Sequence, residues 1–147
     1  MLFEKTLRTA AATMAFLASG SATAHADEAR FVPEATEVSW DGTVATVSFQ
    51  EVDVVVEGTA TTISVKVTAD VDVVCTKGQS TLDIHRSATA LAATEYPVED
   101  GTVTGTAKLP LKVKGPQPPG YSCAVRHRSV TAVLEDFLTG ATLVREA

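Results

Sequence analysis

The stretch ISVKVTADVDVVC, residues 63–75, alternates apolar and polar side chains along almost its whole length. Such alternation is typical of a β-strand with one buried and one solvated face, because successive side chains of a strand point to opposite sides. The odd-numbered residues from Ile63 to Cys75 form the side predicted to be buried, and the even-numbered residues, which include Lys66 and Asp70, form the other. We therefore expect one long strand with a dry face and a wet face.

The same period recurs over residues 103–113. The residues predicted to face inward are Val103, Gly105, Ala107, Leu109, Leu111 and Val113. Pro110 lies on the outward register, and because proline donates no ladder hydrogen bond it indicates an edge strand or a bulge.

Gly-containing dipeptides separate these runs and predict tight turns. They are Asp41-Gly42, Lys77-Gly78, Asp100-Gly101 and Thr139-Gly140. Between them we count about seven to nine strands, at the spacing of roughly 8 to 12 residues that antiparallel sandwiches show. The sequence therefore predicts one domain over residues 27–147, an all-β antiparallel sandwich of immunoglobulin-like type.

Two interruptions of the alternation predict β-bulges, in which one extra residue shifts the parity of a strand. The apolar side of the run that includes Phe49 changes parity near Gln50, so that Val52 continues it. A second change falls between Val125 and Val130.

Some segments allow more than one interpretation. Residues 87–94, SATALAAT, suit either a few helical turns or a strand of small side chains, and we favour the strand. Trp40 shares the spacing of Val38 and is expected in the core, whereas Tyr96 and Tyr121 lie close to prolines and are expected on loop surfaces.

The first 26 residues have the features of a secretory signal peptide. Lys5 and Arg8 precede a small apolar run, and Ala24-His25-Ala26 places small residues at the two positions that a signal peptidase reads. We expect cleavage after Ala26 and a secreted, extracellular product. The alternative, a membrane anchor, is disfavoured because the apolar run is well short of the ~20 residues needed to cross a bilayer.

Secretion determines how the two cysteines are interpreted. Outside the cytoplasm a single pair in a small domain typically forms a disulfide, so we predict a bond between Cys75 and Cys123. Closing a loop of roughly 50 residues stabilises a fold by about 4 kcal/mol in the loop-entropy model. The alternative is a reactive thiol, but neither cysteine has a CxxC partner or a basic setting.

Charge excludes one class of partner. The chain of 147 residues has a net charge of −6, and residues 27–147 contain 10 Lys and Arg against 17 Asp and Glu, which gives −7. Nucleic-acid binding requires a basic patch or stripe, so it is not expected. The short alternating apolar runs also fit poorly with disorder or with a membrane-spanning bundle.

Few side chains suit catalysis. Asp83 and His85 could form a triad with Ser80 or Ser122, but no nucleophile motif accompanies them. His85 and His127 could share a zinc ion, but they lack the close-spaced ligand pair of zinc sites.

Paired carboxylates suggest calcium as a further alternative. Glu51 with Asp53, and Asp70 with Asp72, each place two acids on one predicted strand face, although no glycine-containing acidic loop accompanies them. Charged side chains on a wet face more commonly protect a sheet from edge-to-edge aggregation. We therefore predict no catalytic residues, no metal, no cofactor and no enzymatic activity.

Two binding functions remain. The first is a protein-protein interaction module or adaptor that binds another secreted protein through a sheet edge or its N-terminal segment, with Phe31, Val32 and Tyr121 as candidate contact residues. The second is a proteinase inhibitor that uses the stiff loop Pro118–Cys123, in which Tyr121 would fill a specificity pocket. Basic residues around His127 suit contacts with acidic groups, and we expect a monomer in isolation.

The chain resembles the small, valine- and threonine-rich, single-disulfide secreted β-proteins of filamentous actinobacteria. The segments Val71–Gly78 (VDVVCTKG) and Thr131–Asp136 (TAVLED) carry this resemblance. It implies no general activity. Some small secreted β-proteins of these bacteria are adaptors in antibacterial toxin particles, where they link a lectin-like subunit to a scaffold, and the resemblance implies this role for the first hypothesis.

Overall fold

The computed structural model describes residues 28–115 and 117–147, so the predicted signal peptide lies outside the described residues. Eight strands and one short 3-10 helix make up this part of the chain. They are β1 (Arg30–Phe31), η1 (Pro33–Ala35), β2 (Glu37–Trp40), β3 (Val44–Val52), β4 (Ala60–Lys77), β5 (Ser80–Pro97), β6 (Val103–Pro110), β7 (Ser122–Asp136) and β8 (Thr142–Glu146). No helix among the described residues is long and apolar enough to cross a bilayer.

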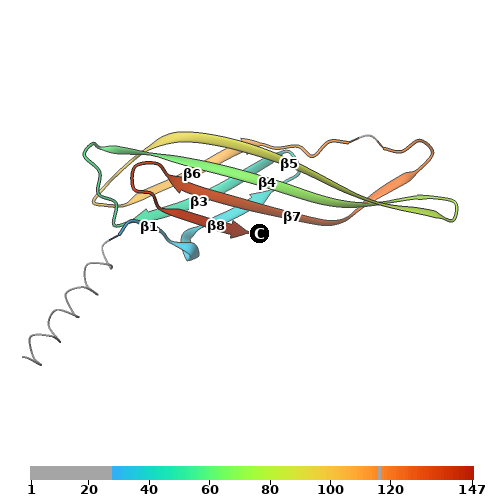
Figure 1. The fold of residues 1–147 in the computed structure, drawn as a ribbon, viewed down its shortest axis with the longest axis horizontal. Coiled ribbons are helices and arrows are strands. Elements are labelled where there is room, and N and C mark those ends of the chain that lie inside the picture. Colours follow the sequence, from blue (N-terminus) through green and yellow to red (C-terminus); the bar gives the residue numbers. More distant parts are fainter. Residues whose placement is uncertain (1–27, 116) are drawn as a thin grey trace, which may run out of the picture.

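The strands form two four-stranded sheets that face each other (Figure 1). In the first sheet β3 pairs with β6 along one side and with β2 and β1 along the other. In the second sheet the order is β5-β4-β7-β8. All pairings are antiparallel, which confirms the predicted all-β class with two antiparallel sheets.

The predicted turns occur where the glycine dipeptides place them. Asp41-Gly42 joins β2 to β3, and the Asp41 carboxylate accepts hydrogen bonds from the backbone N–H groups of Thr43 and Val44, each at 2.8 Å. Asp100 and Gly101 both have positive φ, as a type I′ turn requires, between β5 and β6. The remaining two dipeptides join β4 to β5 and β7 to β8.

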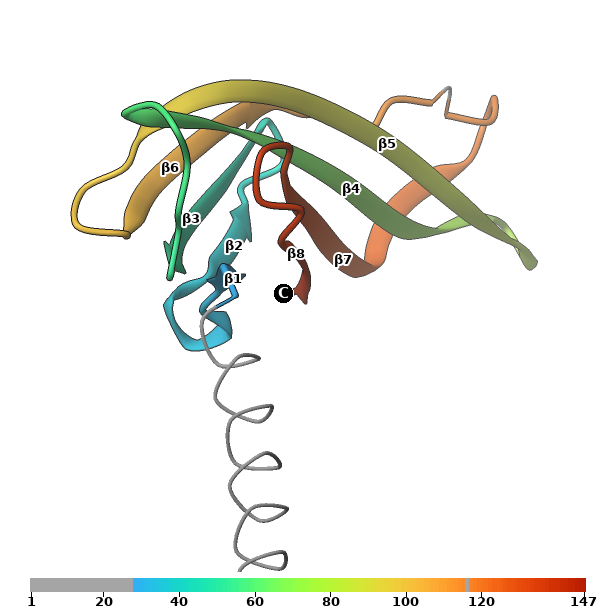
Figure 2. The same ribbon diagram turned by 60° about the vertical axis from the view of Figure 1, so that its left-hand side comes forward.

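The two sheets enclose an apolar core, but they differ greatly in length. β4 and β5 have 18 residues each, whereas β3 has nine. Figure 2 shows the second sheet as a long arch that extends beyond the first. The main core includes Val47, Phe49 and Leu134, and a smaller second cluster under the extension contains Val71, Val73 and Cys75.

The connection between β6 and β7 and the end of β2 cover this second cluster. Val113 and Tyr121, from the connection between β6 and β7, pack against it together with Trp40. Trp40 donates its indole N–H to the Leu111 carbonyl oxygen at 2.9 Å, and the Arg128 guanidinium lies over the indole ring at 5.4 Å from its centroid. The predicted core position of Trp40 is therefore a half-buried one that bridges the two clusters.

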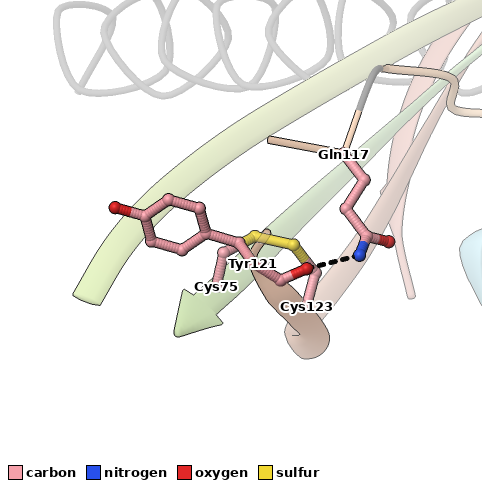
Figure 3. Close-up of a disulfide and its surroundings, with 4 residues drawn as sticks. All are labelled: Cys75, Gln117, Tyr121 and Cys123. Carbon is pink, nitrogen blue, oxygen red and sulfur yellow. Dashed lines mark hydrogen bonds between the residues drawn. A yellow bond between two sulfur atoms is a disulfide. The ribbon is translucent and has the colours of Figure 1, made fainter. Parts of the chain in front are cut away.

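The predicted disulfide between Cys75 and Cys123 is confirmed (Figure 3). It joins residues that lie directly opposite each other on β4 and β7, with Cα atoms 4.0 Å apart. The bond therefore links neighbouring strands of one sheet, whereas the conserved disulfide of antibody domains links the two sheets. The immunoglobulin-like assignment stays a prediction.

One of the two predicted bulges is confirmed and the other is wrong. β7 contains an extra residue, Arg126, because Asp72 pairs with His127 and Val73 pairs with Val125. In contrast, β3 pairs without interruption past Gln50. The alternation of buried residues continues from Phe49 to Glu51. The prediction followed apolar side chains only, so it did not place a carboxylic acid such as Glu51 in the core. As predicted from Pro110, β6 is an edge strand of its sheet.

Residues 87–94 form part of β5, which confirms the strand interpretation. Tyr96 is a correction, because it lies in β5 and not on a loop. Its ring packs edge-to-face on Phe49 with centroids 5.1 Å apart, and burial raises the pKa of its hydroxyl. The neighbouring Pro97 ends the strand only after Tyr96 has reached the core.

Substitution of Gly105 tests the packing of Tyr96. A Cβ at Gly105 would lie 2.6 Å from both Phe49 Cζ and Tyr96 Cε1. We expect Gly105→Ala to destabilise the fold by roughly 1–3 kcal/mol, because both rings are held by neighbours. Gly58→Ala is the matched control, since a Cβ there has no heavy atom within 4 Å. Equal unfolding free energies for the two variants in urea would contradict this packing.

Removal of the disulfide tests how far the extension depends on it. The bond closes a sequence separation of 48 residues, for which we expect the double variant Cys75→Ala, Cys123→Ala to lose about 4 kcal/mol of unfolding free energy. Hydrogen exchange should show the largest loss of protection in β7 near Cys123. A uniform loss over the whole domain would argue against a local role.

Candidate functional site

Strand β5 has a free edge. It pairs with β4 along its full length, and no other strand among the described residues pairs with its opposite side. A free edge presents unpaired backbone N–H and C=O groups, which can pair with a strand from another chain. The edge of β5 is the longest in the described part of the molecule.

The turn between β4 and β5 determines which backbone groups point outward. Gly78 has φ of 60° and the loop between Lys77 and Ser80 has two residues, a geometry in which the closing pair is hydrogen-bonded. Even-numbered residues of β5 therefore bond to β4, in agreement with the bond of 2.9 Å from the Val98 N–H to the Thr59 carbonyl oxygen. The odd-numbered residues direct their N–H and C=O groups to the free edge.

Residues 87–94 of this edge lack the usual protection against strand addition. They include no charged residue, no proline and no bulge. Proteins commonly protect edges with lysine, proline, bulges or short strands. The other edges show this protection, because β6 carries Lys108 and Pro110, and β8 has only five residues.

An exposed apolar row continues from this edge across the outer face of the second sheet. Leu91, Val133 and Val144 lie in register on β5, β7 and β8, with the Lys66 side chain of β4 between the first two. Leu91 is 67% exposed and Val144 is 61% exposed. A strand added to β5 would therefore lie beside apolar side chains as well as backbone groups.

A buried pair of acids lies between the sheets at the end nearest the β7–β8 turn. Glu51 comes from β3 and Asp136 from the end of β7, and both are 0% exposed. Asp136 Oδ1 accepts hydrogen bonds from the Thr61 hydroxyl at 2.6 Å and from the N–H groups of Leu138 and Thr139 at 2.8 and 3.1 Å. The Thr139 hydroxyl donates to Glu51 Oε2 at 2.9 Å.

The remaining oxygens, Glu51 Oε1 and Asp136 Oδ2, are buried and have no hydrogen-bond partner among the described residues. Burial, together with the hydrogen bond to Asp136, raises the pKa of Glu51 to about 8. Burial also acts to raise the pKa of Asp136, but hydrogen bonds from Glu51, Thr61 and the turn lower it overall. Glu51 is therefore the protonated member of the pair and Asp136 the ionised one.

This pair fixes the turn that follows β7. Asp136 binds the backbone of the turn in the manner of an Asx-turn, and Thr139 ties the same turn to β3 in the other sheet. Both carboxyl groups are sealed from solvent, so their direct role is structural. The sequence patterns did not predict that Glu51 and Asp136 come together. The one signal for it was Asp136 four residues before Gly140, which is typical of a turn.

His85 lies on the outer face of the second sheet between two acids. Its Nδ1 is 2.8 Å from Asp72 Oδ1 and its Nε2 is 3.1 Å from Asp70 Oδ1. The hydrogen bond with Asp72 raises the pKa of His85, and the same bond lowers the pKa of Asp72. Both nitrogens favour the doubly protonated ring, which is the wrong state for a general base.

The candidate triad does not assemble. Asp83 lies 3.5 Å from Arg126, and His85 is held by Asp70 and Asp72. His127 pairs with Asp72 from the opposite strand. Within the described residues no group of three or more His, Cys, Asp and Glu side chains forms a potential metal site.

Of the two acid pairs considered as calcium ligands, one is separated in the structure and the other is in contact with His85. Glu51 points into the core, whereas Asp53 is exposed and forms an ion pair with Arg30 at 2.6 Å, so the two do not share a face. The structure therefore corrects their placement. Asp70 and Asp72 do share a face, where His85 lies against both.

Phe31 and Val32, two of the predicted contact residues, are already engaged within the fold. Phe31 is 4% exposed and packs edge-to-face on Phe49. Val32 is half-buried and donates its N–H to the Gln50 carbonyl oxygen at 2.9 Å. The N-terminal segment thus pairs with β3 of its own chain. The interface proposed below therefore does not include the side chains of Phe31 and Val32.

Tyr121 is half-buried on the second cluster (Figure 3). Its carbonyl oxygen accepts a hydrogen bond from Gln117 Nε2, and Lys77 Nζ lies 5.9 Å from the ring centroid. A proteinase pocket would have to draw this ring away from Val73 and the disulfide. This arrangement does not favour the substrate-like loop of the inhibitor hypothesis.

In comparisons with protein-family models, curated proteins and solved structures, nothing matches this chain. The fold and its sites therefore rest on the chain's own residues.

The raised pKa of Glu51 predicts a pH-dependent stability. Glu51 has an ordinary pKa of 4.5 when exposed and about 8 in the fold. Between these values the folded chain binds more protons than the unfolded chain, so stability falls as pH rises. The slope for one group is at most about 1.4 kcal/mol per pH unit. Asp136 does not oppose this fall in stability between pH 4.5 and 8. Its pKa is lowered from 3.8, so its carboxylate is ionised in the folded and the unfolded chain over that range.

The variant Glu51→Gln isolates this effect. Glutamine does not titrate, and its amide oxygen can still accept from Thr139, so we expect a flatter stability profile from pH 5 to 8 in urea unfolding. Glu57→Gln, at an exposed acid, is the control and should keep the wild-type slope. If Glu51→Gln also kept that slope, Glu51 would not be the group whose titration sets it.

Proposed function

We propose that this chain is a secreted, non-enzymatic protein-protein interaction module, an immunoglobulin-like sandwich that binds a partner by strand addition to β5. The observation that carries the proposal is the free edge at residues 87–94, with outward backbone groups and no charge, proline or bulge. Strand addition gains affinity from main-chain hydrogen bonds and specificity from the side chains on either face.

Geometry supports β5 over the other edges. An added strand along residues 87–94 would have the apolar side chain of Leu91 on one face and the small side chains of Ala88, Ala90 and Ala92 on the other. Small side chains leave room for those of the incoming strand. An adaptor role, including one that joins subunits of an extracellular antibacterial toxin, is the form of this function that we propose for the chain in its native setting.

The variant Leu91→Pro tests strand addition. The N–H of residue 91 points to the free edge, so proline removes one edge donor and leaves the β4–β5 ladder intact. We expect the variant to fold normally but to lose most partner capture from the culture medium of the secreting organism. Hydrogen exchange should show protection of residues 87–94 in the wild-type complex alone.

Leu91→Ala is the matched control, because it removes the same side chain and retains the N–H. It should capture more partner than Leu91→Pro. Equal capture by all three chains, with residues 87–94 unprotected in the complex, would remove β5 from the interface.

A further inference from the structure

A second exposed apolar surface lies at the end of the molecule where loops 53–59 and 137–141 meet (Figure 1). Val55 is 86% exposed, Phe137 is 55% exposed and Leu138 is 62% exposed. Contact between large apolar side chains and an apolar partner is favourable because it removes apolar surface from water. Clusters of such side chains on a surface therefore indicate interaction sites. Val55 and Leu138 line the same two depressions, and we call these two residues the apolar tip.

The apolar tip borders two open depressions. One, of about 490 Å³, is lined by Glu28, Asp53 and Thr139 among others. The other, of about 340 Å³, is lined by residues 55–58. Val55 and Leu138 line both, so the two side chains form a ridge between the depressions. A ridge between two depressions can contact more than one apolar side chain of a partner segment.

The tip is held in place before any partner arrives. Asp136 fixes the N–H groups of Leu138 and Thr139, and the Gly140 N–H donates to the Asp136 carbonyl oxygen at 2.9 Å. On the facing loop, the Val54 N–H donates to the Gly101 carbonyl oxygen at 2.9 Å. A fixed surface loses less entropy on docking than a mobile loop does.

Acidic side chains surround the tip. In the loops at this end the exposed carboxylates are Glu28, Asp53, Glu57, Glu99 and Asp100. Arg30, paired with Asp53, is the cation beside them. The opposite end carries Lys77, Lys112, Lys114, Arg126 and Arg128. The tip is therefore apolar within a negative field, which favours cationic groups on a partner.

We propose that the apolar tip docks a protein segment in which apolar side chains are flanked by lysine or arginine. Apolar side chains of that segment would contact Val55 and Leu138, and its cations would face Glu57 and Asp100. An anionic bilayer is disfavoured by the same carboxylates. This surface is separate from the β5 edge and does not depend on it, so the molecule has two surfaces with which to join two partners.

Fluorescence anisotropy with a labelled peptide of leucine and arginine tests the proposal, using the secreted chain. We expect binding that weakens with salt, and a peptide of leucine and glutamate that binds at least about tenfold more weakly. Leu138→Ser should weaken binding of the arginine peptide about tenfold or more. Leu91→Ser, which removes an equally exposed leucine at the β5 edge, is the matched control and should bind like the wild type.

Other outcomes would overturn the proposal. These are equal binding of both peptides, an unchanged affinity in Leu138→Ser, or binding to phosphatidylcholine vesicles without peptide binding. Self-association in sedimentation velocity that Leu138→Ser abolishes would instead identify a second copy as the occupant. Unfolding in urea checks that the variant folds. Because Leu91→Pro retains the tip, failure of strand addition and failure of tip binding are seen separately.

Discussion

The pairing of β4 on both of its sides is the constraint on which the rest of the structure depends. β4 is the one strand that pairs with β5 over 18 residues and with β7 from Ile63 to Thr76. Its alternation defines the buried face of the second sheet, and its length forces that sheet to extend beyond the first. The extension in turn needs the second cluster and the bond between Cys75 and Cys123, because Trp40 at the end of β2 is the only part of the first sheet among the described residues that packs against that cluster.

The same constraint leaves β5 exposed. A strand of that length has a partner on one side only, since β6, the next strand in sequence, turns into the other sheet at Asp100-Gly101. The alternation and the turn residues made the all-β class, the turn positions and a bulge between Val125 and Val130 predictable. They did so because side-chain period and turn chemistry are local properties, which one segment displays without reference to any other.

Long-range contacts were not predictable in the same way. Glu51 looks like a surface acid, and its burial depends on Asp136 and on Thr139, which is 88 residues away in the sequence. Tyr96 beside Pro97 resembles a loop residue until Phe49 and Gly105 are placed next to it. Phe31 was likewise predicted only as a candidate contact residue, because its place against Phe49 depends on β1 pairing with the end of β3.

The buried proton and the apolar tip are linked through Asp136. Its carboxylate holds the turn that carries Leu138, and its ionised state depends on the proton that Glu51 retains. If Glu51 ionised, two buried negative charges would face each other where the turn meets β3. A partner that binds the ordered turn must then also favour the protonated Glu51, because linkage between two equilibria is reciprocal. If the tip docks the proposed segment, we therefore expect that binding to weaken as the pH rises through the Glu51 pKa of about 8, although the peptide contacts neither carboxyl group.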